Sequence, residues 1–140
     1  MTAIEAPRIY PAIRFRNAER MIAFLCDAFG FTVHAKYMTD AGKVAHAELA
    51  LGSSMIMCGD EKDDEFGAMV GPADGGGGKA LYVAVDDADA AFERARAAGA
   101  DILQGLVDRD YGSREFICRD PEGNVWSFGT YWPKAHEPAG

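Results

Sequence analysis

The chain has 140 residues, of which 49% are hydrophobic, 26% charged and 11% aromatic, and these proportions exclude disordered and fibrous proteins. Its 22 acidic and 14 basic side chains give a formal charge of −8, which argues against a nucleic-acid or anionic membrane partner, because both need a basic face. This length and composition predict a single domain, residues 1–140, with enough apolar residues to bury a core.

The first half of the chain predicts a strand, a helix and three further strands. Residues 9–15 alternate in polarity as a strand does. Residues 18–29 place apolar side chains at helical spacing, between Asn17 as a candidate N-cap and Gly30 as a candidate left-handed residue after the helix. The three strands that follow are expected at residues 32–38, 43–51 and 54–58.

Residues 60–79 separate the two halves and are first acidic and then rich in glycine. We predict a linker or mobile loop here. It does not match a phosphate-binding loop, because Lys79 is followed by Ala80 rather than by Ser or Thr, and by a predicted strand rather than a helix.

The second half repeats the element order of the first. The predicted elements are a strand at residues 80–85, a helix at 88–98, and strands at 102–104, 115–119 and 124–131. Asp86 or Asp87 caps this helix and Gly99 ends it. The same offset of 69 residues separates Asn17 from Asp86 and Gly30 from Gly99, which indicates an internal repeat.

This repeat predicts module one at about residues 8–59 and module two at about residues 80–132. The expected fold class is α+β: two βαβββ modules that form a curved mixed sheet around a cleft, with the helices outside. A single module has too little partner surface to bury both its helix and its sheet.

The three cysteines, Cys26, Cys58 and Cys118, lack the CxxC spacing of a redox or metal motif. Buried, reduced thiols in a cytoplasmic protein are the simplest explanation. The first residues show no signal-peptide pattern, and no apolar stretch is long enough to span a bilayer. We therefore expect a cytoplasmic location and no membrane partner.

Several stretches of sequence carry a resemblance to a known family. They are residues 15–19 with 28–31, 46–49 with 51–54, 85–89, and 111–126 with the Asp-Pro-Glu-Gly-Asn turn at 120–124. They resemble the vicinal oxygen chelate superfamily, which contains glyoxalases, bleomycin resistance proteins and ring-cleaving dioxygenases. The resemblance covers about residues 8–132 and implies the fold. It does not fix an activity, because this fold serves both enzymes and binding proteins.

The resemblance also implies where a metal site would lie. Metal enzymes of the family take two His or Gln from the first strands of the modules and two carboxylates from the last strands. The corresponding positions here are Tyr10, Ala80, Met57 and Ser127. A phenol, a methyl, a thioether and a hydroxyl do not suit a hard divalent cation, so we expect no metal and no cofactor.

Strand alternation sorts the side chains around the expected cleft. The candidate ligand-binding residues on this side are Tyr10, Arg14, Met55, Met57, Tyr82 and Ser127. Such a lining suits an organic ligand with a flat ring or apolar body and an anionic group. The two tyrosines either stack on the ligand or serve ordinary packing.

Two polar positions have alternative explanations. By resemblance, Arg14 matches an arginine that contacts a substrate carboxylate in glutathione-using members, but an ion pair with Glu48 or a neighbouring acid explains it equally well. His46 and Glu48 share one face of their strand. They are candidate catalytic residues as an acid–base pair, or else a structural pair on a solvated sheet face.

The leading hypothesis is a metal-independent protein of the bleomycin-resistance kind, which sequesters an aromatic or planar small molecule, as in antibiotic resistance. The alternative is a superfamily enzyme, a glyoxalase-like lyase or isomerase or a dioxygenase, with a shifted site at His46 and Glu48. A third possibility is a module without a ligand that offers only a partner surface. The resemblance also implies a homodimer, and open sheet edges favour partners.

Overall fold

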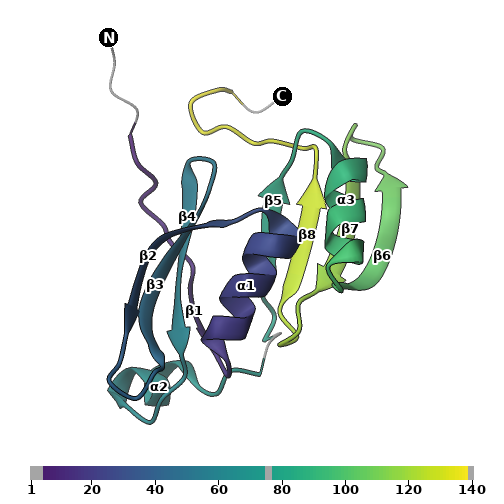
Figure 1. Ribbon diagram of the computed structural model, residues 1–140. Helices are drawn as coiled ribbons and strands as arrows, with labels where there is room; N and C mark the ends of the chain where they lie inside the picture. Colours follow the sequence, from purple (N-terminus) through teal and green to yellow (C-terminus); the bar gives the residue numbers. More distant parts are fainter. Residues whose placement is uncertain (1–4, 75–76, 139–140) are drawn as a thin grey trace. The chain divides into compact units, whose positions relative to one another are not determined.

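The computed structural model describes residues 5–74 and 77–138 and contains the two predicted modules (Figure 1). Module one comprises β1 (Ala12–Phe15), α1 (Ala18–Phe29), β2 (Thr32–Met38), β3 (Val44–Leu51) and β4 (Ser54–Asp60). Module two comprises β5 (Leu81–Ala84), α3 (Ala88–Ala97), β6 (Asp101–Asp108), β7 (Arg114–Arg119) and β8 (Val125–Gly129). The α+β class and the repeated βαβββ order are confirmed. The chain divides into two compact units, Met1–Ala73 and Asp74–Gly140.

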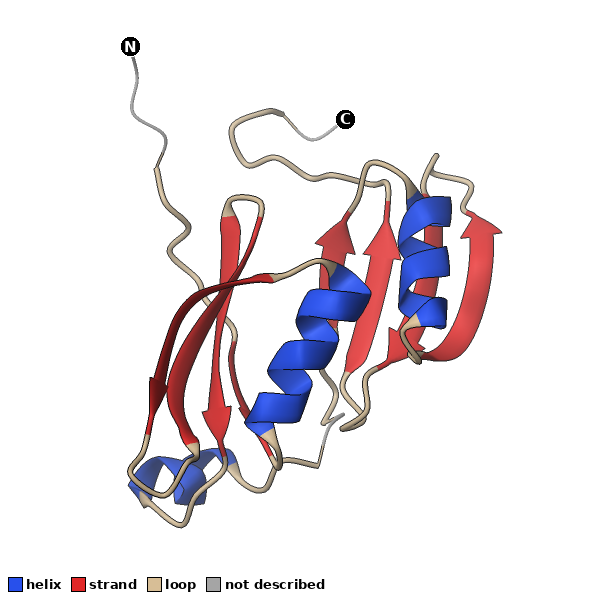
Figure 2. Ribbon diagram, viewed as in Figure 1, coloured by secondary structure: helices blue, strands red, loops and turns tan. Residues whose placement is uncertain are grey.

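Each unit contains one four-stranded mixed sheet with the same topology (Figure 2). The strand orders are β1-β4-β3-β2 and β5-β8-β7-β6. In each sheet the first strand runs parallel to the last, and the other pairs are antiparallel. Ala12 lies opposite Met57 in the first sheet and Tyr82 lies opposite Ser127 in the second, so Met57 and Ser127 occupy equivalent places.

Helix α1 begins and ends where the sequence predicts. The side chain of Asn17 accepts a hydrogen bond from the backbone N–H of Arg20 at 3.2 Å, and Gly30 has a left-handed φ of 83°. Between these caps, Met21 and Leu25 are fully buried on one face of the helix. This face packs on the first sheet, because apolar positions three and four residues apart lie on the same side of a helix.

The core of module two is aromatic. Phe116 of β7 stacks on Phe128 of β8 with ring centroids 4.9 Å apart, and Phe92 of α3 meets Phe116 edge to face at 5.3 Å. Trp126 is 1% exposed and donates its indole N–H to the Asp120 carboxylate at 3.0 Å. Helix α3 therefore covers one face of the second sheet and leaves the other face to Glu115, Ser127 and their neighbours.

Some boundaries differ from the prediction. Strand β1 begins at Ala12 rather than at residue 9, and Ile9 is 88% exposed. Pro11 lacks the N–H that a longer ladder would need at that position. Strand β6 is longer than predicted and ends at Asp108. The N-cap of α3 is Asp87, one position later than the repeat spacing indicates.

The region predicted as a linker or mobile loop contains a short helix, α2 (Glu65–Val70), which no pattern in the sequence indicates. Asp64 caps it by accepting a hydrogen bond from the backbone N–H of Gly67 at 2.7 Å. Asp60 is also not part of a linker, because it ends β4 and is only 7% exposed. Within the described residues, no helix is both long and apolar enough to cross a membrane.

Candidate functional site

Among the described residues of module one, helix α1 packs on one face of the first sheet. Ala47, Leu49, Ile56 and Cys58 point toward α1 and are buried. Their neighbours along the strands, His46, Glu48, Met55 and Met57, are only partly buried. We call this second side, together with Arg14 of β1, the open face of module one. The burial pattern agrees with the sorting of side chains that strand alternation predicts.

The two first-strand positions lie outside the strands that the structure forms. Tyr10 precedes β1 and is half-buried, whereas Ala80 precedes β5 and is exposed. The backbone pairing nevertheless extends to Pro11, whose carbonyl accepts a hydrogen bond from Met57 N–H at 2.8 Å. Tyr10 directly precedes Pro11, the last residue on this side whose backbone pairs with β4. Because Tyr10 itself is outside β1, strand alternation does not fix the direction of its side chain.

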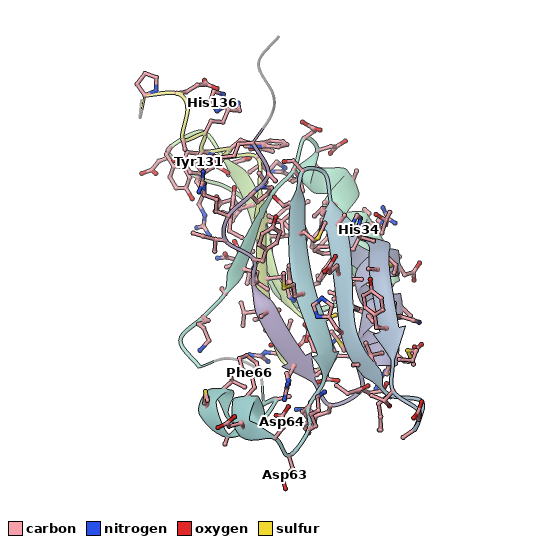
Figure 3. All side chains as sticks on the ribbon, turned by 90° about the vertical axis from the view of Figure 1, so that its left-hand side faces the viewer. His34, Asp63, Asp64, Phe66, Tyr131 and His136 are labelled. Atoms are coloured by element: carbon pink, nitrogen blue, oxygen red, sulfur yellow. The ribbon has the colours of Figure 1, made fainter. Side chains whose placement is uncertain are left out.

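His46 and Glu48 meet on the open face as predicted from their spacing. His46 Nε2 lies 3.0 Å from Glu48 Oε2. His34 of β2 approaches the other carboxylate oxygen, with Nε2 3.9 Å from Oε1, and the Tyr37 ring stacks on His46 at 6.2 Å. His34 (Figure 3) has no partner at a recognisable spacing in the sequence, so only the β2–β3 pairing reveals it. The Glu48 carboxylate thus pairs with the His46 imidazole and lies near that of His34.

Arg14 does not pair with Glu48. Its guanidinium forms a two-pronged ion pair with Asp64, with Nη1–Oδ1 2.7 Å and Nη2–Oδ2 3.1 Å, and lies 4.9 Å from the centre of the Phe66 ring. Asp64 and Phe66 lie close together at the end of the sheet (Figure 3). The Arg14 hydrogen bond, aided by Gly67 N–H, lowers the pKa of Asp64 to about 2. Of the two ion pairs expected for Arg14, with Glu48 or with a neighbouring acid, the structure therefore forms the second, and the acid is Asp64.

An open cavity of about 490 Å³ lies beside this ion pair. It is formed by the end of β1 and by the chain around α2, and its charged lining residues are Arg14, Lys62, Glu61 and Asp63. A cavity of this volume is within the range of small-molecule sites.

The face of the second sheet opposite α3 carries Tyr82 and Ser127. Tyr82 is 41% exposed, and its hydroxyl donates to the carbonyl of Tyr131 at 2.7 Å. Burial of the remaining part of the ring raises the pKa of Tyr82. Gly129 leaves the room that this arrangement needs, since a Cβ there would lie 2.5 Å from the Tyr82 hydroxyl and 2.7 Å from Glu115 Cγ.

A polar and aromatic cluster around Glu115 was missed from the sequence. The Glu115 side chain accepts hydrogen bonds from the Tyr111 hydroxyl at 2.8 Å and from Arg109 Nε at 3.1 Å. Burial alone would raise the pKa of Glu115, but these bonds and one with Ser113 outweigh it and keep the pKa below its usual value. Tyr111 and Tyr131 meet edge to face at 6.1 Å and expose much of their rings. The turn residues 109–113 that bring them together gave no strand or helix signal.

In residues 5–74 and 77–138, no group of three or more His, Cys, Asp or Glu side chains is arranged to hold a metal ion. The places equivalent to the family's carboxylates, Met57 and Ser127, supply a thioether and a hydroxyl. Ala80 supplies no donor at all. The residues present therefore do not fit the divalent cation that the resemblance implies.

A family comparison matches residues 9–128 to the Glyoxalase/Bleomycin resistance protein/Dioxygenase superfamily. An uncharacterized protein of Mycobacterium bovis is 30% identical over 125 residues, which cover 88% of this chain and 82% of the relative. An uncharacterized protein of Mycobacterium tuberculosis is also 30% identical over 125 residues, with 74% of that relative covered.

Solved structures agree with this fold. TioX from Micromonospora sp. ML1 superposes with a TM-score of 0.69 at 29% identity, covering 88% of this chain and 94% of TioX. A glyoxalase/bleomycin resistance protein/dioxygenase family enzyme from Burkholderia phytofirmans PsJN superposes with a TM-score of 0.69 at 24% identity, covering 86% and 94% of the two chains. The second likeness concerns the fold alone.

Proposed function

The chain belongs to the glyoxalase/bleomycin resistance protein/dioxygenase superfamily, and from this premise we propose that it binds a small planar organic anion without using a metal. Sequestration of such a compound, as in antibiotic resistance, requires no bond to be made or broken. In this proposal Arg14 holds the anionic group, and the neighbouring apolar and aromatic side chains hold the ring.

This proposal rests mainly on the side chains of Met57 and Ser127, which stand where metal enzymes of the superfamily have carboxylates. The strand register gives them equivalent places, opposite Ala12 and Tyr82. Neither side chain is a carboxylate, so the donor set of a superfamily metal enzyme is missing at both of them. A thioether in one module and a hydroxyl beside a tyrosine in the other are suited to contact an organic molecule.

Each module offers proposed contacts of its own, on the open face of module one and on the sheet face of module two that carries Tyr82. Met55 and Met57 are flexible apolar side chains that adapt to a ring. Tyr82 offers an aromatic face and is 41% exposed. Tyr10 and Ser127 complete the proposed set of ligand contacts.

The first prediction concerns metal content and the role of Arg14. We expect the purified protein to retain no stoichiometric metal by plasma mass spectrometry.

We expect calorimetry to detect binding of anthracene carboxylate and much weaker binding of uncharged anthracene methanol. Arg14→Gln should weaken carboxylate binding about tenfold or more, because a charge-assisted hydrogen bond is lost.

Arg20→Gln is the matched control, because Arg20 is an exposed arginine on α1. It should bind the carboxylate as the unaltered protein does. One tightly held Zn, Ni, Mn or Fe ion per chain would overturn the proposal, and so would equal binding of the two anthracene compounds.

A second candidate function rests on the His46–Glu48 pair. The 3.0 Å contact and the approach of His34 to the same carboxylate give an oriented imidazole that could move a proton. This would suit a superfamily enzyme acting on a 2-oxoaldehyde adduct or a catechol, with its site shifted to these residues.

The second prediction separates this candidate from binding alone. If the pair is catalytic, Glu48→Gln should abolish turnover in an assay of 2-oxoaldehyde–thiol adducts or catechols. Glu93→Gln, an exposed position on α3, should leave turnover unchanged. Turnover that survives Glu48→Gln contradicts the enzymatic candidate, and so does the absence of turnover in the unaltered protein.

A further inference from the structure

We propose that Asp64 is a built-in competitor for the ligand's anionic group: when a carboxylate binds Arg14, Asp64 leaves it and the chain around α2 moves away. We call residues 61–73 the α2 segment. This inference rests on the proposed function, because it needs Arg14 to accept a ligand anion.

Asp64 occupies Arg14 in the way that a free carboxylate would. Both carboxylate oxygens meet both terminal nitrogens of the guanidinium, at 2.7 and 3.1 Å, which is the parallel fork that binds carboxylates most specifically. The Arg14 side chain is 17% exposed and that of Asp64 38%, so the pair remains open to solvent on the Asp64 side. A ligand carboxylate can reach the same nitrogens only if Asp64 withdraws.

The α2 segment is held by few contacts that resist withdrawal. None of the residues of α2 is buried, and Phe66, Met69 and Val70 are 45%, 74% and 51% exposed. Polar contacts hold its two ends: Glu61 N–H donates to a β1 carbonyl, Ala73 N–H donates to the Glu61 carboxylate, and the Arg16 guanidinium donates to the Ala73 carbonyl. With so little apolar surface to expose, opening of the middle costs little free energy.

The surroundings of Arg14 define the class of ligand. With the α2 segment in place, the Phe66 ring covers the guanidinium at 4.9 Å. When the segment moves away, it frees that face of the guanidinium, on which an aromatic body attached to the carboxylate can stack. Lys62 adds a second cation to the cavity, while Glu61 and Asp63 add two acids. These acids repel dianions, so the site favours an aromatic monocarboxylate over a phosphate ester.

The Asp64 carboxylate competes with a ligand carboxylate for Arg14 at every physiological pH. Because the pKa of Asp64 is about 2, its carboxylate is charged throughout the neutral range and holds Arg14 until strongly acidic conditions. Only molecules in which Arg14 is released can bind, so the apparent affinity for a ligand is the intrinsic affinity multiplied by that released fraction.

The first arm of the test needs no ligand. Asp64→Asn removes the charge but keeps a good helix N-cap, so it separates the ion pair from the capping bond to Gly67. Amide hydrogen exchange of residues 65–70 should accelerate in Asp64→Asn and in Arg14→Gln. It should not accelerate in Asp40→Asn, an exposed aspartate of the β2–β3 turn with the same change of charge. Unchanged exchange in both ion-pair variants would overturn the inference.

The second arm uses calorimetry with anthracene carboxylate. Asp64→Asn should bind it about tenfold more tightly than the unaltered protein, because the internal carboxylate is gone, and Asp40→Asn should not. Adding the compound to the unaltered protein should also accelerate exchange of residues 65–70. If Arg14→Gln weakens binding but Asp64→Asn does not strengthen it, the role of Asp64 as a competitor is refuted, while the proposed function stands. Absence of binding in every variant overturns both.

Discussion

Asp60 links three elements of module one through a single carboxylate. It ends β4, and its two oxygens accept hydrogen bonds from Ala18 N–H at 2.9 Å and from Val44 N–H at 2.7 Å. The first residue of α1 and the first residue of β3 are thereby tied to the last residue of β4. In the sequence Asp60 is only the first member of an acidic run, so nothing distinguishes it from exposed neighbours such as Asp63.

The third prediction tests this role. Asp60→Ala should lower the free energy of unfolding by about 3 kcal/mol, because it leaves two buried N–H groups without an acceptor. Asp60→Asn should lower it less, since its one oxygen can still accept. Urea denaturation followed by circular dichroism measures both changes. Asp40→Ala is the control and should stay within about 0.5 kcal/mol of the unaltered protein, as exposed substitutions do. A similarly small effect of Asp60→Ala would contradict the role.

At the scale of whole elements, prediction succeeds where a local signal is long and bounded. The sequence predicts helix α1 at its observed bounds, because a cap, an amphipathic pattern and Gly30 agree with one another. Helix α2 was missed, because six residues without a buried member show no periodic pattern. What stabilises α2 is its cap and the pairing of Asp64 with Arg14, a residue 50 positions away.

Within the candidate site too, residues on one regular strand are predictable from the sequence, and contacts between distant segments are not. His46 and Glu48 were expected on one face, because alternation along one strand decides it. The partners of Arg14 and Glu115 come from an irregular segment and a turn, whose paths depend on tertiary contacts. The sequence contains their residue types but not their proximity.

The fourth prediction compares the two helix starts. Asn17 caps α1 and Asp87 caps α3, and each side chain accepts a hydrogen bond from the backbone N–H three residues on, at 3.2 and 3.0 Å. Replacing either with Ala should cost about 1 kcal/mol in thermal or urea unfolding. Replacing either with Ser should cost much less. Equal stability of the Ala and Ser variants at one position would show that this cap does not stabilise its helix.

The exposed edges of the two sheets favour association between chains. Each sheet has two edge strands, β1 and β2 in module one and β5 and β6 in module two. Val33 and Tyr37 of β2 are 48% and 61% exposed, and Leu103 of β6 is 44% exposed. Exposed apolar side chains on sheet edges favour pairing with another chain. We propose that the protein forms a homodimer, as the family resemblance implies.

The fifth prediction is that light scattering gives twice the chain mass. A formal charge of −8 on each chain opposes association, so the dimer should tighten as salt rises and the screening length falls below about 10 Å. Val33→Lys should weaken it if β2 forms part of the contact. A monomer at every salt concentration would rule out the homodimer.

The two tryptophans give this molecule a pair of optical reporters in opposite environments. Trp126 is 1% exposed with its indole N–H bonded to Asp120, whereas Trp132 is 49% exposed beyond the last strand. A soluble quencher such as acrylamide should therefore quench the fluorescence of Trp132, while the fluorescence of Trp126 persists until the protein unfolds. One cuvette can then follow the integrity of the second core and events near the C-terminal end at the same time.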